Sequence, residues 1–164
     1  MVQIRHLEEN DHKVIISVLK DWWGGRDLSG LLPRLFFQHF RPTSFVLEDQ
    51  GRIIGFLVGF LSQTYPNEAY IHFAGLDPDY HRQGLGRLLY DHFFETVKGF
   101  GRTTVRAITS PVNKTSIAFH TGLGFTIEEK GEILDGVPVA PDYDGRDGAR
   151  VLFKKDLSPI VPRQ

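Results

Sequence analysis

The 164-residue chain contains no cysteine. Disulfide bonds, thiolate metal sites and a cysteine nucleophile are therefore all excluded. Neither the histidines nor the carboxylates are grouped at metal-ligand spacing, so we expect no metal site. The absence of thiols fits a reducing compartment, and we expect a cytoplasmic protein.

The chain also lacks an excess of charge and a long apolar segment. Nineteen basic against 20 acidic residues leave a net charge of −1, which gives no case for binding nucleic acid. The longest apolar run, "IIGFLVGFL" at 53–61, contains two glycines and is too short to span a membrane. The first residues, "MVQIRHLEENDHK", lack the apolar core of a signal peptide. We therefore predict neither a nucleic-acid nor a membrane partner.

Apolar residues, in contrast, are plentiful. Hydrophobic residues make up 41% of the chain and aromatic residues 12%, which is enough to build a buried core. The length suits one domain. We predict a single domain over residues 1–157 and a C-terminal tail over 158–164.

Hydrophobic periodicity predicts alternating strands and helices. The expected strands are 2–7, 43–48, 53–62, 68–76, 102–109, 124–130 and 149–157. The expected helices are 10–23, 31–40, 84–101 and 113–121. Strand, helix and strand over 70–109 form a unit whose strands should be parallel, with a right-handed crossover. The prediction is an α/β (α+β) fold with a mixed, twisted, mostly antiparallel sheet of about seven strands and helices on both faces.

Two glycines stand where the strand 68–76 leads into the long helix, in "HRQGLGR". Gly84 and Gly86 allow the backbone to approach an anion without obstruction by a Cβ atom. The first turn of a helix offers unpaired N–H groups and the positive end of the dipole, which favour a pyrophosphate. Further donors at the rim are His81, Arg82 and Arg87. The alternative is that the glycines only allow a tight turn.

Two better-known phosphate motifs do not fit this turn. A P-loop needs Gly-Lys-Ser/Thr, which is absent. A dinucleotide fingerprint needs a third glycine where Leu89 stands. A nucleotide site here must therefore be of another kind.

Two segments carry a resemblance to a known family. "LDPDYHRQGLGRLLY" at 76–90 resembles the acetyl-CoA-binding motif of the GNAT superfamily of N-acetyltransferases, V-x-P followed by R/Q-x-x-G-x-G/A at the start of a helix. "NKTSIAFHTGLGF" at 113–125 resembles that family's N-x-x-A-x-x-Φ-Y-x-x-x-G-F segment, where Φ is apolar. The element order matches as well. His81 replaces the first Arg or Gln, and His120 replaces a tyrosine that often protonates the departing thiolate.

The resemblance implies a binding mode for acetyl-CoA as cosubstrate. The central strands would splay apart, and the pantetheine arm would lie in the gap and pair with backbone groups near Ala74 and Leu76. Asn113 would cap the next helix and contact the arm, and Phe119 would pack nearby. The pyrophosphate would lie on the turn formed by His81, Arg82, Gln83, Gly84, Leu85, Gly86 and Arg87.

The implied reaction is direct transfer of the acetyl group to a primary amine of a small molecule or peptide. The alternative is a non-catalytic acyl-CoA-binding module or sensor that lost the tyrosine. A Rossmann-type dinucleotide protein is a third, weaker possibility. Relatives in this superfamily are often dimers, so a homodimer is possible.

Three side chains are candidates for the chemistry. His120 could protonate the thiolate, because imidazolium is a donor near pH 6.5 and the end of a helix favours the charged form. It could instead contact CoA with no proton role. The general base could be His72 or Glu68 on the strand 68–76, or a water. A core position for His72 and a solvated carboxylate for Glu68 remain the alternatives.

The acceptor side is expected at the first two helices and at the 18-residue segment 131–148, which is long for a compact domain. Trp22 and Trp23 could hold an amine by cation–π contact, although at least one should pack in the core. Seven acidic residues against two basic ones over 128–147 could attract a cationic amine or merely be solvated. Tyr143 is the aromatic candidate there.

Overall fold

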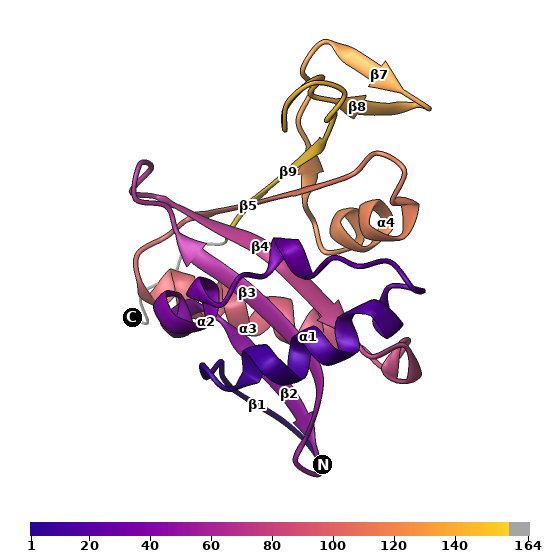
Figure 1. The fold of residues 1–164 in the computed structure, drawn as a ribbon. Coiled ribbons are helices and arrows are strands. Elements are labelled where there is room, and N and C mark those ends of the chain that lie inside the picture. The colour runs from indigo at the N-terminus through magenta and orange to yellow at the C-terminus, as the bar shows by residue number, and fades with distance from the viewer. Residues whose placement is uncertain (158–164) are drawn as a thin grey trace. The chain divides into compact units, whose positions relative to one another are not determined.

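The computed structural model describes residues 1–157, so the expected tail 158–164 lies outside the described residues. The strands are β1 (Val2–His6), β2 (Phe45–Asp49), β3 (Arg52–Leu61), β4 (Glu68–Leu76), β5 (Thr104–Thr109), β6 (Thr126–Ile127), β7 (Glu132–Leu134), β8 (Val137–Val139) and β9 (Val151–Asp156). The α-helices are α1 (Asp11–Trp22), α2 (Leu35–His39), α3 (Leu85–Gly99) and α4 (Lys114–Gly122). Short 3-10 turns are η1 (Ser29–Leu31), η2 (Arg41–Thr43) and η3 (Pro78–Tyr80). Figure 1 shows their course.

Seven strands are hydrogen-bonded in the order β1-β2-β3-β4-β5-β9-β6, and β7 and β8 form a separate ribbon. The β4–β5 pair is parallel, whereas the β1–β2, β2–β3, β5–β9 and β6–β9 pairs are antiparallel. The predicted mixed, mostly antiparallel sheet of seven strands is therefore confirmed. No helix within residues 1–157 is both long and apolar enough to cross a membrane.

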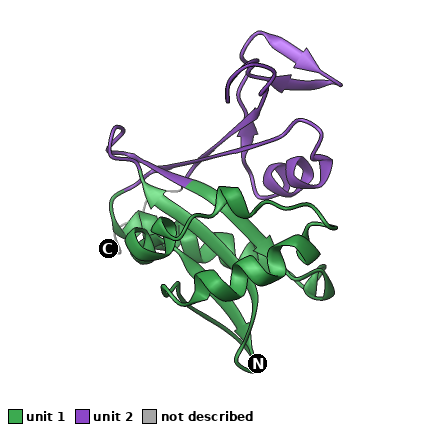
Figure 2. Ribbon diagram, in the orientation of Figure 1, with its two compact units in different colours: residues 1–61, 71–101 green, residues 62–70, 102–164 purple. Residues whose placement is uncertain are grey.

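The chain packs as two compact units, coloured separately in Figure 2. The first comprises Met1–Leu61 and Ile71–Gly101, and the second comprises Ser62–Tyr70 and, among the described residues, 102–157. β4 contributes to both, because its first three residues belong to the second unit. Their parallel register with β5 runs from Glu68↔Thr104 to Tyr70↔Arg106.

In the first unit, helices cover both faces of the sheet, as predicted. Val46 of β2 lies in the same buried cluster as Ile15 and Leu19 of α1. Its neighbour Phe45 points the other way and meets the ring of His92 on α3, with 4.6 Å between ring centroids. Successive strand residues alternate between faces, so the two helices lie on opposite sides, as Figure 1 also shows.

Three predicted elements differ from the structure. The helix expected over 31–40 shrinks to the five residues of α2, which begins two positions after Pro33. The strand expected over 124–130 is the two-residue β6. The segment 131–148 is not an unstructured loop, because it contains the β7–β8 ribbon. Asp135 and Gly136 make its turn with φ of 50° and 78°, and Asp-Gly is the pair that such hairpin turns favour.

Gly75 of β4 lets Trp23 pack directly on the strand. A Cβ atom at this position would lie 2.5 Å from Cη2 of Trp23 and 2.7 Å from Cε1 of Phe56. We expect Gly75→Ala to lower the free energy of unfolding by about 1–3 kcal/mol, the usual cost of overpacking. Urea denaturation measures this loss. Gly99→Ala is the control, because its Cβ would meet nothing within 4 Å; equal destabilisation by the two substitutions would contradict the packing argument.

Candidate active site

The glycine turn of the first unit joins β4 to α3. Gly84 is the N-cap of α3, with φ of 74°, and Arg82 also has a left-handed backbone, with φ of 66°. Leu85 is buried and anchors the first turn of the helix, whereas Gly84 and Arg87 are exposed. Because glycine has no side chain, no side-chain cap is present at the start of α3.

Asp77, which sequence reasoning did not select, holds this turn in place. Its buried carboxylate accepts a hydrogen bond from the Asp79 amide at 2.9 Å and from Nη2 of Arg52 at 2.5 Å. Its own amide donates to the carbonyl of Ile54 at 2.8 Å. The signal was the Asp-Pro dipeptide, a common start of a turn.

The seven predicted pyrophosphate ligands are brought together in the first unit, close in sequence to the end of β4. His81 folds back, with Nε2 at 3.3 Å from the carbonyl oxygen of Leu76. The carbonyl group of Leu76 therefore lies next to the turn, and Ala74 precedes it by two residues on β4. The set is His81, Arg82, Gln83, Gly84, Leu85, Gly86 and Arg87.

His72 of β4 is held by two neighbours. Its Nε2 donates to the carbonyl oxygen of Leu31 at 2.6 Å. Its ring stacks on Phe36 with 4.4 Å between centroids and 10° between planes. A carbonyl oxygen can only accept, so Nε2 carries the hydrogen and the neutral ring has its basic lone pair on Nδ1.

The two tryptophans pack against the core without being fully buried. Trp22 stacks on Phe56 at 6.2 Å, and Trp23 meets Phe73 at 5.1 Å. Both are partly buried side chains at the edge of the α1 core cluster. They lie in the same unit as His72 and the glycine turn.

The other candidates lie in the second unit. Asn113 caps α4, as predicted, since its Oδ1 accepts from the Ser116 amide at 3.1 Å. The ring of Phe119 meets that of His120 edge to face at 5.6 Å. The start of α4, the helix that carries Phe119 and His120, is thus fixed by a local cap.

His120 is buried in this unit. Its Nδ1 lies 2.8 Å from the carbonyl oxygen of Ser116, and its ring stacks on Phe153 at 4.4 Å. Burial lowers the pKa of His120, and the Ser116 carbonyl opposes this only partly. The shift is therefore opposite to the one expected from the helix end, because desolvation of the ring outweighs the dipole.

This shift makes the stability of the fold depend on pH. The unfolded chain binds a proton at His120 near pH 6.5, whereas the folded chain resists it. We therefore expect the contribution of His120 to be complete above pH 7 and to be lost as the pH falls below about 6.5. The difference in Tm between wild type and His120→Gln should narrow from pH 8 to pH 5. A constant difference would contradict a depressed pKa.

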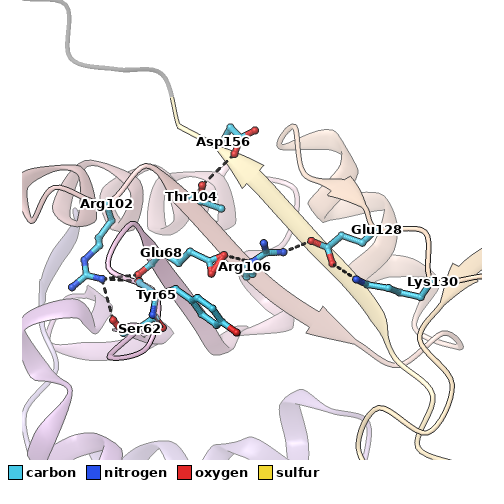
Figure 3. A network of polar contacts seen from close by, with 9 residues as sticks. All are labelled: Ser62, Tyr65, Glu68, Arg102, Thr104, Arg106, Glu128, Lys130 and Asp156. Atoms are coloured by element: carbon cyan, nitrogen blue, oxygen red, sulfur yellow. Dashed lines mark hydrogen bonds and ion pairs between the residues drawn. The ribbon is translucent and has the colours of Figure 1, made fainter.

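Glu68 belongs to a chain of ion pairs in the second unit (Figure 3). Arg106 donates from Nε to the Glu68 carboxylate and from Nη1 to that of Glu128. Glu128 in turn lies 3.6 Å from Nζ of Lys130. The Glu68 carboxylate is therefore paired with a guanidinium rather than solvated.

Tyr143 lies on the segment after the ribbon and is 48% exposed. Burial raises the pKa of Tyr70 on β4, and Tyr143 and Asp144 raise it further by their charges. Asp144 itself is paired with Nε of Arg150 at 3.1 Å. The segment 131–148 is thus tied to Arg150, the residue directly before β9.

The sequence matches the model of the acetyltransferase (GNAT) family over residues 12–125, which is more than half of the chain. The chain belongs to this family. The matched GNAT region contains the glycine turn and the α4 segment, the two segments on which the sequence resemblance rested. The recognition of a GNAT acetyltransferase from these two segments is therefore confirmed.

One relative is the [ribosomal protein bS18]-alanine N-acetyltransferase of Escherichia coli K12, 30% identical over 112 residues, 68% of this GNAT chain and 70% of the relative. Among solved structures, Ard1 from Thermoplasma volcanium superposes with a TM-score of 0.77 at 20% identity, covering 96% of this chain and 98% of that one. The putative acetyltransferase yncA from Salmonella typhimurium, solved with its cofactor acetyl-CoA, gives 0.71 at 17% identity, covering 100% and 98%. At these identities the structures show the shared fold.

Proposed function

We propose that this GNAT protein transfers the acetyl group of acetyl-CoA directly to a primary amine of a small molecule or peptide. The observation that carries the proposal is the uncapped first turn of α3 behind a left-handed glycine. A relative named for acetylating an alanine amine and a structural neighbour solved with acetyl-CoA support it.

The residues at the turn fit a CoA pyrophosphate. A Cβ atom built on Gly84 meets nothing within 4 Å, so the backbone is open on that side. Amides of residues 82–87 would bind the phosphate oxygens, and Arg82 and Arg87 would add positive charge. Main-chain groups of Ala74 and Leu76 would hold the pantetheine arm. The thioester supplies the acetyl group.

We assign the general base to His72 rather than to Glu68. The amine must lose a proton to become nucleophilic, and Nδ1 of His72 has the lone pair for it while Nε2 donates to Leu31. The proton then lies on Nδ1, and the imidazolium keeps its hydrogen bond and its stack on Phe36.

For His120 we favour a role in packing without proton transfer. An acid at neutral pH would need the imidazolium form, which burial disfavours. Turnover of His120→Ala and His120→Tyr as a function of pH tests this. Unchanged pH dependence in folded His120→Ala supports the packing role. A loss of turnover specific to low pH, where an imidazolium could form, and restored by tyrosine, would assign His120 as the acid.

Two measurements test the proposed function as a whole. Acetyl-CoA and CoA should raise the Tm of the protein, and NAD should not. A thiol-release assay with a panel of amines should then show turnover that requires both substrates. Tight CoA binding with no turnover on any amine would favour the acyl-CoA sensor, and stabilisation by NAD alone would refute the acetyltransferase.

A further inference from the structure

A continuous series of aromatic rings surrounds His72 in the first unit. We call Trp22, Trp23, Phe36, Phe40, His72 and Phe73 the aromatic array. Phe36 stacks on His72 and meets Phe40 at 5.2 Å. On the other side, Phe73 lies 6.4 Å from the His72 ring and 5.1 Å from Trp23. His72 is thus in the middle of the series rather than at its end.

The array is only half-buried. All six of its residues are partly exposed, although Phe56, on which Trp22 and Phe73 stack, is completely buried. Two exposed leucines adjoin the array, Leu31 at 49% and Leu35 at 47% exposure. Partly exposed aromatic side chains that pack against one another offer apolar surface to a ligand.

The array and the proposed base are held by the same contacts. The carbonyl of Leu31 fixes the tautomer of His72, and Phe36 fixes the plane of its ring. A group that lies on the neighbouring rings would therefore be adjacent to the imidazole whose Nδ1 we propose as the base. Ring faces also attract an ammonium group before it loses its proton.

We propose that the acceptor is a primary amine attached to an aromatic or other bulky apolar group, and that the aromatic array selects it. This inference rests on the proposed N-acetyltransferase function.

The proton and bond balance is simple. The ammonium form of the acceptor lies on the rings and gives one proton to Nδ1 of His72. Its nitrogen lone pair then forms the C–N bond to the acetyl carbonyl carbon, the C–S bond breaks, and the thiolate leaves with the electron pair. The amide nitrogen loses its second proton to water.

The test compares matched amines in the thiol-release assay with the full chain and acetyl-CoA. Phenethylamine is paired with ethylamine and putrescine, and a peptide with N-terminal phenylalanine is paired with one with N-terminal alanine. We expect kcat/KM to favour the aromatic member by at least about tenfold, since small apolar differences already discriminate by about 10- to 200-fold. The free amines and the peptides show whether the aromatic amine comes from a small molecule or from the N-terminus of a peptide.

Substitutions within the array should change the preference itself. Phe36→Leu and Phe40→Leu are expected to reduce the ratio of kcat/KM between phenethylamine and ethylamine severalfold. Phe100→Leu, at an exposed phenylalanine outside the array, should leave the ratio unchanged. The ratio of kcat/KM between the two amines does not depend on how much of the enzyme is folded. If one of the two array variants does not fold, the other still tests the proposal.

The possible failures are distinguishable. If ethylamine, putrescine or the alanine peptide is acetylated as well as its aromatic partner, the array does not select the acceptor, while the proposed function stands. An unchanged ratio in both array variants has the same meaning. If no amine is acetylated and acetyl-CoA does not raise the Tm, the proposed function fails and the inference with it.

Discussion

Gly84→Val should weaken acetyl-CoA binding by at least about 100-fold, or about 2.7 kcal/mol. Gly84 has φ of 74°, and a β-branched residue is a steric outlier there. The backbone must leave this conformation, so the amides that follow no longer converge on one anion. Each hydrogen bond to a charged group contributes about 1.5–3 kcal/mol, and losing two gives the expected effect. Isothermal titration with acetyl-CoA measures it.

Two controls separate binding from folding. Gly101→Val places the same residue at φ of 80° just beyond the other end of α3, in equally open space. It should cost comparable stability and leave the affinity for acetyl-CoA intact. Gly84→Asn keeps a residue that tolerates the left-handed region and should retain affinity within about tenfold. Equal losses of affinity in the two valine variants would show that helix stability, not the turn, controls binding.

Replacing His72 should have the largest effect on turnover. Loss of a general base costs about 10²- to 10⁴-fold in rate. We expect kcat to fall by that amount in His72→Ala, with little change in the affinity for acetyl-CoA. His72→Gln is the sharper variant, because its amide can still donate to the Leu31 carbonyl but offers no basic nitrogen.

The comparison of these variants decides what His72 does. If His72 acts as the base, kcat is low in both His72→Ala and His72→Gln, and added imidazole partly restores the kcat of His72→Ala. If it only tethers η1 to β4, His72→Gln should keep most of the activity, and the assignment is then wrong. His39→Ala, at an exposed histidine of α2, is the control for general effects of removing an imidazole.

The sequence predicted those parts of the site that depend on local order. The turn at 82–87 has glycines, a preceding Asp-Pro and an apolar-periodic helix within a few residues, so each signal supports the next. The cap of α4 by Asn113 is equally local, because its partner is the Ser116 amide. Both were predicted at the residues where the structure has them.

Contacts between distant residues were not predictable. Leu31 and Phe36 fix His72 from 41 and 36 positions away, and no periodicity connects them. The burial of His120 depends on Phe153, which follows it by 33 positions. A helix-end argument for His120 therefore had the wrong direction, because desolvation depends on the packed partner. The β7–β8 ribbon, by contrast, had a local signal, the Asp135-Gly136 pair. This signal was missed because the segment 131–148 was judged by its length only.

The guanidinium of Arg102 closes the connection between β3 and β4. Its Nη1 donates to the carbonyl oxygens of Ser62, Tyr65 and Glu68 at 3.0, 3.1 and 3.2 Å (Figure 3). Every one of these acceptors is a main-chain atom, which all amino acids possess. The grip of Arg102 on this connection is therefore independent of the side chains at these three positions, so the shape of a surface turn depends on one arginine far along the chain.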